Sequence, residues 1–337
     1  MALAHSAGQL ALRQAVFGIP FVLRSLLGPL PAPLPLRPGR MFVGIDLGGT
    51  TVKLGVCDPD GTVHARRTID TEAERGSDDT IARIAIAVRE LTDDVGAISG
   101  CGIGAPGELD VERSHLLRAN HFPGWANVPL PGRVARAVGV PTTLENDANC
   151  AAWAEFRVGT GRGSRSLACF TLGTGVGGGI VIDGELRIGA NGAAGALGHI
   201  SVDPNGPPCR CGQRGCVEQY ASATAVANRY ARGSARDAFA AAAIGEQDAI
   251  AAVDWACDGL AAGVANVIHT IQPDVVVLAG GMAEAGDVML ERVRAGVARR
   301  VRPSWLSAIR IEVATLGTDA GWIGAALWNA RLLERVR

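Results

Sequence analysis

The sequence predicts an α/β fold built as two lobes, and three observations support this. The chain has 337 residues, 48% of them hydrophobic and 45 of them glycine, a size and composition that suit two α/β domains with substantial cores. Apolar runs of strand length alternate with helical segments. Two glycine-rich hairpins, at 46–51 and 172–175, share one design, which suggests a duplicated fold.

The first lobe is expected at residues 41–158. Residues 41–46 have the pattern of a buried strand, 52–57 alternate as a second strand, and 62–69 form a third after a turn at 58–61. Helix, strand, helix, strand and helix are then predicted at 79–91, 98–103, 130–138, 142–144 and 148–158. This alternation indicates βαβ units attached to a strand meander.

The second lobe is expected at residues 159–317. Its first strand, 166–172, leads into Gly173-Thr-Gly-Val-Gly-Gly-Gly179, which matches the dinucleotide pattern G-x-G-x-x-G. We reject a dinucleotide site, because a strand and hairpin turn follow where that fold needs a helix, and the acidic residue expected about 20 positions later is missing. A long helical region to 271, a strand at 274–279, a helix at 286–300, a strand at 310–313 and a last helix at 322–337 complete the prediction.

Residues 1–40 differ from the rest of the chain. They contain four arginines, no Asp or Glu, and a proline-rich run at 28–39. The apolar run at 14–23 contains Pro20 and is too short to cross a bilayer. A signal peptide would need a small-x-small cleavage site after this run, and a transit peptide would carry more serine. We interpret 1–40 as a non-core extension, non-native or misassigned, with Met41 as the natural start.

Charge and lysine usage exclude several functions. The formal net charge is −1, so the chain lacks the basic field expected of a protein that binds nucleic acid or an anionic membrane. Lys53 is the only lysine, and no Gly-Lys pair occurs, which excludes a P-loop. We expect a cytoplasmic protein that acts on small molecules.

A Gly- and Pro-rich stretch holds one histidine and three cysteines within eighteen residues: His199, Cys209, Cys211 and Cys216. Three thiolates and one imidazole form a complete tetrahedral ligand set for a structural zinc. Free thiols in a loop are the alternative, because Cys-x-Cys-x4-Cys is tighter than the commonest zinc-finger spacing. A disulfide is less favoured. Such a site would orient Glu218, which suggests a polar small-molecule pocket beside it.

The first glycine-rich hairpin has the composition of an anion site. Gly48 and Gly49 allow backbone amides to approach a phosphate, Thr50 and Thr51 add hydroxyl donors, and Asp46 could hold a metal-bound water. A purely structural hairpin is the alternative. Near the end of the chain, Gly280-Gly281 could admit a flat base against the backbone or merely turn the chain.

Polar residues gather where predicted strands end. The segments 102–107, 120–125 and Glu145-Asn-Asp147 are all such connections, and ligands of open α/β sheets bind outside the carboxyl ends of strands. Asn146 and Asp147 also precede an alanine-rich helix, where N-capping alone would explain them. On this motif alone, capping is favoured over catalysis.

From Met41 onward the chain resembles the ROK-family sugar kinases, most closely the bacterial glucokinases. The motifs occur in the family's order: Asp46-Leu-Gly-Gly-Thr50, Gly104-Ala-Pro-Gly107, Glu145-Asn-Asp147, Leu172-Gly-Thr-Gly175, Gly198-His199, Cys-x-Cys-Gly-x-x-Gly-Cys-x-Glu ending at Glu218, and Ala279-Gly-Gly281. The resemblance implies an actin-like (hexokinase/ribonuclease H-like) ATPase fold, two α/β lobes around a cleft, with the helix at 318–337 packing back on the first lobe. It also implies a homodimer.

The resemblance implies a role for each motif residue. Asp147 resembles the general base. The implied sugar ligands are Gly107, Asn120, Asn146, His199 and Glu218. The implied Mg-ATP contacts are Asp46, Gly48, Gly49, Thr50, Thr51, Thr174, Gly175, Gly280 and Gly281. The implied structural zinc ligands are His199, Cys209, Cys211 and Cys216.

The activity that the resemblance implies is ATP-dependent phosphorylation of a hexose hydroxyl, glucose to glucose 6-phosphate, with Mg²⁺ and a structural Zn²⁺. Kinases of mannose, fructose, N-acetylglucosamine or N-acetylmannosamine are alternatives, and a non-catalytic sugar-binding protein is another. The family also contains repressors with a helix-turn-helix module, for which 1–40 is too short and too rich in proline.

One position departs from the family pattern. ROK kinases usually carry Glu-x-Gly-His, whereas this chain has Ala196-Leu-Gly-His199. The missing carboxylate resembles a ligand of the sugar hydroxyls on the anomeric side. We therefore expect weaker glucose affinity, or a relaxed preference at C1 and C2 of the sugar, in a working kinase.

Overall fold

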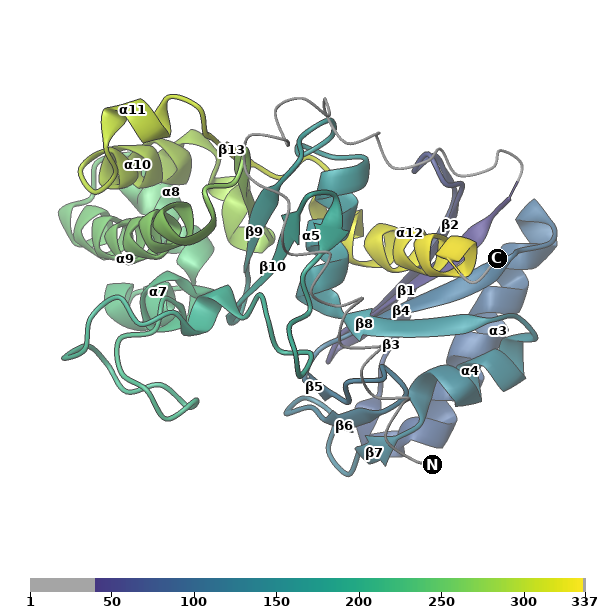
Figure 1. Cartoon of the computed structure of the whole chain (residues 1–337). Coiled ribbons are helices and arrows are strands. Elements are labelled where there is room, and N and C mark those ends of the chain that lie inside the picture. Colours follow the sequence, from purple (N-terminus) through teal and green to yellow (C-terminus); the bar gives the residue numbers. More distant parts are fainter. Residues whose placement is uncertain (1–39, 336–337) are drawn as a thin grey trace, which may run out of the picture. The chain divides into compact units, whose positions relative to one another are not determined.

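Two five-stranded sheets of matching topology form the framework of the fold (Figure 1). Their strand orders are β3-β2-β1-β4-β8 and β11-β10-β9-β12-β13. In each sheet three antiparallel strands form a meander, and the first strand of the meander then pairs in parallel with a later strand, which pairs in parallel with the last. The predicted α/β class and the predicted duplication are confirmed. The structure is a computed structural model that describes residues 40–335, so the predicted extension lies almost entirely outside the described residues.

The first sheet contains β1 (Phe42–Leu47), β2 (Thr51–Cys57), β3 (Val63–Asp70), β4 (Gly100–Ala105) and β8 (Thr142–Asn146). Helices α3 (Ser77–Val95) and α4 (Leu130–Val138) share a hydrophobic cluster with these strands. Each predicted strand and helix of this region is present, with ends shifted by a few residues. A short helix, η1 (Ala73–Arg75), connects β3 to α3.

The sequence analysis missed a small three-stranded sheet, which contains β5 (Glu108–Leu109), β6 (Leu116–Arg118) and β7 (Ala126–Val128). It lies in the segment between β4 and α4 that was interpreted as loops. Strands of two or three residues are too short to show a period-2 pattern, so local sequence cannot reveal them.

The second sheet contains β9 (Leu167–Leu172), β10 (Val176–Ile182), β11 (Glu185–Leu186), β12 (Val275–Ala279) and β13 (Arg310–Val313). The helical region predicted up to residue 271 is four helices: α6 (Glu218–Ala221), α7 (Ala223–Tyr230), α8 (Ala235–Ala243) and α9 (Gln247–Ile271). The predicted helix at 286–300 is α10 (Asp287–Ala298), preceded by η3 (Gly281–Ala285) and followed by α11 (Pro303–Leu306). The short helices η2 (Leu197–His199) and η4 (Gly317–Asp319) complete the described part.

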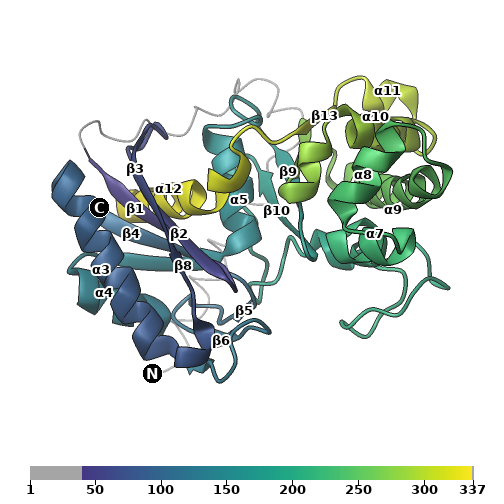
Figure 2. The same ribbon diagram turned by 180° about the vertical axis from the view of Figure 1, so that it is seen from behind.

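Two helices, α5 (Asp147–Arg157) and α12 (Ala320–Arg335), share one hydrophobic cluster with strands of both sheets (Figures 1 and 2). Glycines allow α12 to lie directly on the first sheet. A Cβ atom added to Gly44 would lie 1.7 Å from the carbonyl oxygen of Trp322, and one added to Gly102 would lie 1.8 Å from that of Ala325. The last helix therefore packs on β1 and β4, far from its neighbours in sequence.

Among the described residues, α9 is the one helix long and apolar enough to cross a membrane by length and composition. Within its most apolar 18-residue window, 61% is buried in the fold, and its apolar side chains belong to the core of the second sheet.

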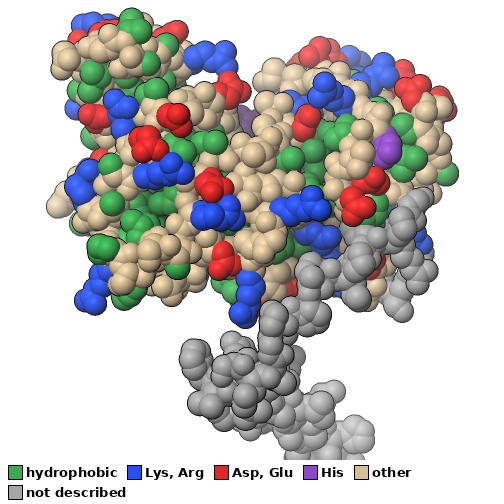
Figure 3. Space-filling model, turned by 90° about the horizontal axis from the view of Figure 1, so that it is seen from above, with side chains coloured by type: hydrophobic (Ala, Val, Ile, Leu, Met, Phe, Trp, Pro, Cys, Tyr) green, Lys and Arg blue, Asp and Glu red, His purple; other side chains and the backbone are tan. Residues whose placement is uncertain are grey.

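On the face drawn in Figure 3, basic and acidic side chains are interspersed. Among the described residues, exposed acidic and basic side chains also form ion pairs, such as Arg292–Asp254 with 2.7 Å between Nε and Oδ1.

One buried carboxylate lies where the chain passes between the two sheets. Glu155, near the end of α5, is fully buried. It accepts hydrogen bonds from the backbone amides of Thr160 and Leu316, each at 2.9 Å. The hydroxyl of Thr160 donates to the carbonyl of Val313, also at 2.9 Å. The connection after α5 and the connection before α12 are thus joined to each other.

Candidate active site

The predicted polar connections meet at one edge of the first sheet. Asp46 at the end of β1 is paired in register with Gly104 of β4, and Gly104 is paired with Glu145 of β8. These strands are parallel, so their carboxyl ends, and the residues that follow them, lie side by side, as expected for a ligand site.

Asn146 and Asp147 have different structural roles at the start of α5. Asn146 is the N-cap, since its side-chain oxygen accepts from the amides of Ala148 at 3.0 Å and Asn149 at 3.3 Å. Asp147 is the first helical residue, and it accepts from the Ala148 amide at 2.8 Å. Burial raises the pKa of Asp147 above its ordinary value, although these hydrogen bonds and the nearby His121 act in the opposite direction. The predicted capping is thus carried out by Asn146.

The charge of Asp147 affects the ionisation of Asp46. Burial and the charge of Asp147 raise the pKa of Asp46 to about 6, and only Lys53 acts in the opposite direction. Two desolvated carboxylates that interact electrostatically are an arrangement that a divalent cation neutralises.

The first glycine-rich turn packs against the 120–125 loop. The amide of Gly48 donates to the carbonyl of Thr51 at 3.0 Å, which closes the turn between β1 and β2. Gly49 faces His121: a Cβ atom at Gly49 would lie 2.8 Å from the Cβ atom of His121. The predicted phosphate turn and the loop with the predicted sugar ligand Asn120 are therefore in contact. The sequence analysis did not single out His121, which no motif marks.

Gly107 packs closely against the residues that precede the same loop. Its φ of +103° is strained for any residue with a side chain, and an added Cβ atom would lie 2.3 Å from the carbonyl oxygen of Arg118. The backbone of Gly107 thus lies against residues 118–119, immediately before Asn120. Two predicted sugar ligands from separate motifs are brought together.

The second glycine-rich turn is joined to α6 and α7. The amide of Gly173 donates to the carbonyl of Gly175 at 2.9 Å. The amide of Val176 donates to a carboxylate oxygen of Glu218 at 3.0 Å, and the hydroxyl of Thr224 donates to the carbonyl of Thr174 at 2.9 Å. Glu218 is the first residue of α6, so the predicted sugar ligand lies against the predicted phosphate turn.

The run of glycines after this turn allows α5 to approach β10. A Cβ atom added to Gly177 would lie 2.8 Å from the Cβ atom of Ala148, and one added to Gly179 would lie 2.5 Å from that of Ala152. Residues 176–182 are a strand, which confirms that the pattern G-x-G-x-x-G is not a dinucleotide site here. The close packing brings the start of α5, with Asp147, next to the strand that carries the second turn.

A cavity of about 720 Å³ opens beside the second turn. Two predicted nucleotide contacts, Thr174 and Gly281, line it. Gly280 instead turns the chain, with φ +88°, and packs against the backbone of Leu172. The sequence did not reveal further lining residues that come from α8 with its N-cap, from η3 and from the first turn of α10, among them Ser234, Arg236, Phe239, Met282, Glu284, Ala285 and Val288. An alanine-rich helix looks like ordinary core in sequence, so no local signal distinguishes a cavity wall.

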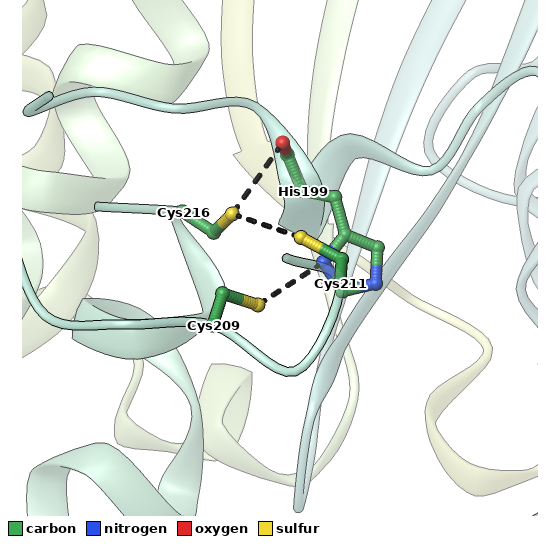
Figure 4. A group of neighbouring side chains, drawn as sticks. All are labelled: His199, Cys209, Cys211 and Cys216. Carbon is green, nitrogen blue, oxygen red and sulfur yellow. Dashed lines mark hydrogen bonds between the residues drawn. The ribbon is translucent and has the colours of Figure 1, made fainter. Parts of the chain in front are cut away.

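The predicted metal ligands form one cluster. His199, Cys209, Cys211 and Cys216 each direct a ligand atom inward, and these atoms all lie within 4.8 Å of one another (Figure 4). The Sγ of Cys209 lies 3.6 Å from Nδ1 of His199, and the Sγ of Cys211 lies 3.6 Å from that of Cys216. Ligand atoms of a tetrahedral zinc site are separated by about 3.6–3.8 Å, given Zn–S and Zn–N bonds of about 2.3 and 2.0 Å. The donor set and its spacing fit zinc.

Ala196 lies three residues before His199, at the exposed start of η2. The turn of η2 packs tightly on β10, because a Cβ atom added to Gly198 would lie 1.9 Å from the carbonyl oxygen of Val176. The position of the missing carboxylate is therefore beside the second turn and the metal cluster.

The model of the ROK family matches residues 42–331 of this chain. The chain belongs to the ROK family. It is 38% identical to a glucokinase of Thermotoga maritima over 308 residues, which cover 86% of this chain and 97% of that protein. It is 36% identical to an N-acetylmannosamine kinase of Citrobacter koseri over 294 residues, which cover 85% of this chain and 97% of that protein.

A solved structure extends the similarity to three dimensions. The ROK glucokinase of Streptomyces griseus, crystallised with glucose and AMPPNP, matches with a TM-score of 0.74 and 31% identity, over 86% of this chain and 99% of that chain. The actin-like fold expected from the sequence is thereby confirmed, and the protein is a ROK sugar kinase, a glucokinase-like phosphotransferase.

Proposed function

We propose that this sugar kinase transfers the γ-phosphoryl group of ATP to a hexose, with glucose as the preferred acceptor and glucose 6-phosphate as the product. The observation that carries the proposal is the position of Asp147, a buried carboxylate of raised pKa whose charge acts on Asp46, at the start of a helix that packs on the strand of the second turn. The glucokinases among its relatives support the choice of glucose.

Asp147 is the proposed general base. Burial raises its pKa, and a carboxylate of raised pKa accepts a proton more readily from an attacking sugar hydroxyl. Phosphoryl transfer passes through a loose transition state, so most of the acceleration comes from placing the hydroxyl in line and neutralising charge. The cap made by Asn146 fixes the start of α5 and so orients the base.

The two glycine-rich turns are the proposed phosphate contacts. Amides of these turns other than those of Gly48 and Gly173, which bond within the turns, would donate to phosphate together with the hydroxyls of Thr50, Thr51 and Thr174. The cavity lined by Thr174 and Gly281 would receive the nucleoside. Asp46, with its raised pKa, is the residue that would hold Mg²⁺, which neutralises phosphate charge when it is bound.

The histidine–cysteine cluster is the proposed structural zinc site. Nδ1 of His199 faces the thiol of Cys209, which leaves Nε2 free to contact a sugar hydroxyl. A metal held there would fix the direction of His199 and of the chain that leads to Glu218. The cluster therefore supports the sugar site without taking part in phosphoryl transfer.

A second candidate acceptor is N-acetylmannosamine. The relative from Citrobacter koseri, an N-acetylmannosamine kinase, favours it. Ala196 favours it too, because the carboxylate missing there resembles a ligand on the anomeric side of the sugar, close to the C2 substituent in which N-acetylmannosamine differs from glucose. A smaller, uncharged side chain leaves room for an N-acetyl group.

A coupled ADP-release screen tests the proposal. Glucose, mannose, fructose, N-acetylglucosamine and N-acetylmannosamine would each be offered with ATP, and the best acceptor again with polyphosphate. We expect the highest kcat/KM with glucose and ATP, and background rates from Asp147→Asn prepared in parallel. Sugar binding without ADP release for any sugar would identify a non-catalytic sugar-binding protein instead.

A further inference from the structure

A buried ion pair involves Glu145, which lies two residues before the proposed base Asp147. Arg113 and Glu145 form a bidentate pair, with 3.0 Å between Nη2 and Oε1 and 3.1 Å between Nε and Oε2. Their side chains are only 12% and 2% exposed. Two parallel hydrogen bonds fix the geometry of both side chains, and burial shields them from water.

Glu145 connects this pair to the start of α5. Its Oε1 accepts from the amide of Asn146 at 2.8 Å and from Nδ2 of Asn149 at 3.0 Å. Asn146 caps α5, and Asp147 follows it. The position of the Glu145 carboxylate therefore determines where the helix that bears the base begins.

Arg113 also reaches a second segment, through the same Nη2 atom that pairs with Glu145. Its Nη2 donates to the carbonyl of Gly192 at 2.9 Å, and its Nη1 donates to the carbonyl of Asp110 at 3.2 Å. Gly192 lies in the turn between β11 and η2, which leads to Ala196 and His199. One guanidinium thus joins the helix of the base to the turn that precedes the proposed sugar ligand His199.

Asn149 faces the same turn with an unsatisfied atom. The residue is 2% exposed, and its Oδ1 is buried without a hydrogen-bond partner. A Cβ atom added to Gly195 would lie 3.3 Å from this Oδ1. Asn149, which donates to Glu145, therefore also packs against the turn that precedes His199.

We propose that Arg113 is a positioning residue of the kinase reaction, an inference that rests on the proposed function. Through its contacts with Glu145 and Gly192, it fixes the position of the 192–199 turn relative to Asp147. The distance between the bound sugar hydroxyl and the base is then fixed as well. Its Nε, Nη1 and Nη2 atoms are all engaged within the protein, so it acts without touching the substrate. A displacement of about 1 Å between reacting groups lowers the rate by about 100-fold, which makes such a link kinetically visible.

The first test replaces Arg113 by lysine. Lysine keeps the positive charge beside Glu145 but cannot make the bidentate pair and reach Gly192 together. We expect Arg113→Lys to lower kcat/KM for glucose roughly 10- to 100-fold while KM for ATP changes less than about two-fold. The matched control is Arg299→Lys, which alters an exposed pair between Arg299, at the C-terminal end of α10, and Asp258 of α9.

The second test disturbs the same contact from the other side. A Cβ atom at Gly192 would lie 2.4 Å from Nη1 of Arg113, so Gly192→Ala pushes the guanidinium and the turn apart and leaves both charges in place. Gly192 has φ +80°, which adds backbone strain of its own. Gly139→Ala controls for that strain, since Gly139 has φ +78° and open space where a Cβ atom would lie.

The outcomes separate a positioning role from a structural one. We expect Gly192→Ala to reproduce the kinetic loss of Arg113→Lys, and the double variant to lose little more, because both changes break one contact. Variants that unfold more easily yet keep wild-type kcat and sugar KM would overturn this inference and leave the proposed function unaffected. A wild-type protein that phosphorylates no sugar would overturn the proposed function and this inference with it.

Discussion

Glu218 accepts a hydrogen bond from the backbone amide of Val176 across 3.0 Å. Glu218 is a predicted sugar ligand, and Val176 ends the turn predicted to contact phosphate. An added Cβ atom at Gly175 would lie 2.6 Å from the same carboxylate, so no side chain fits between them. One side chain thus connects the two substrates' predicted sites.

Two substitutions of Glu218 should separate these roles. Glu218→Gln keeps an acceptor for the Val176 amide but loses the charge, so KM for the sugar should rise roughly 10- to 150-fold while KM for ATP stays nearly constant. Glu218→Ala also removes the acceptor, and KM for ATP should rise as well. Initial rates with each substrate varied in turn measure both constants. Equal ATP constants in the two variants would mean that the contact does not support the turn.

Asp147→Asn should leave the fold and sugar binding nearly intact and lower kcat by roughly 100-fold or more, because the proton acceptor is lost. Steady-state kinetics with sugar binding measured by calorimetry would show this split. Asn146→Ala, which removes the helix cap, is the comparison for stability and should cost about 1 kcal/mol of unfolding free energy. Near-normal turnover in Asp147→Asn would mean that Asp147 is not the base and has only a structural role at the start of α5.

Asp46→Asn should stabilise the ligand-free protein in a pH-dependent way. The pKa of Asp46 is raised from 3.8 to about 6, so the folded protein holds this proton more tightly than the unfolded chain does. Its contribution to stability is therefore lost as the pH rises through about 6, and the neutral variant escapes that loss. We expect a small gain near pH 4.5 and a gain of up to about 3 kcal/mol near pH 8, measured by urea denaturation. Equal gains at both pH values would contradict the assignment.

Cys211→Ser should release the metal and loosen the chain between His199 and Glu218, raising KM for the sugar and lowering stability. Elemental analysis and sugar kinetics on the same preparation would test this. Cys257→Ser, which changes a buried cysteine of α9, should lower stability with the metal content unchanged. Fully active, freshly purified wild-type protein without zinc would disprove the site.

Ala196→Glu should lower KM for glucose and sharpen discrimination against the other sugars. A charged acceptor for a buried hydroxyl is worth about 1.5–3 kcal/mol, or roughly 10- to 150-fold in affinity. Ala196→Gln, of the same length but neutral, should have a smaller effect. An unchanged or higher KM for every sugar tested would mean that the pocket suits another substrate. The assignment of glucose as the preferred acceptor would then be wrong.

Local patterns were sufficient to predict the framework and the short motifs of this protein. The strands β1 and β9 have continuous apolar runs, and the glycine-rich turns that follow them are contiguous in sequence. The pairing of Arg113 with Glu145 joins residues 32 positions apart, and its bond to Gly192 spans 79 positions, so no periodicity encodes either. His121 was missed for the same reason, because its importance comes from packing against Gly49. Tertiary contacts of this kind depend on where whole elements meet.

Glu155 makes the two connections between the sheets depend on each other. If either connection opens, the carboxylate loses an amide donor while its charge stays buried, which is far more costly than an exposed loop movement. The second connection is weakened when Glu155 moves, since its amide donates to the other oxygen of the same carboxylate. Partial unfolding of one sheet with the other left native is thereby disfavoured. A chain with more than one hydrophobic core is thus driven to denature cooperatively, as a single thermodynamic entity.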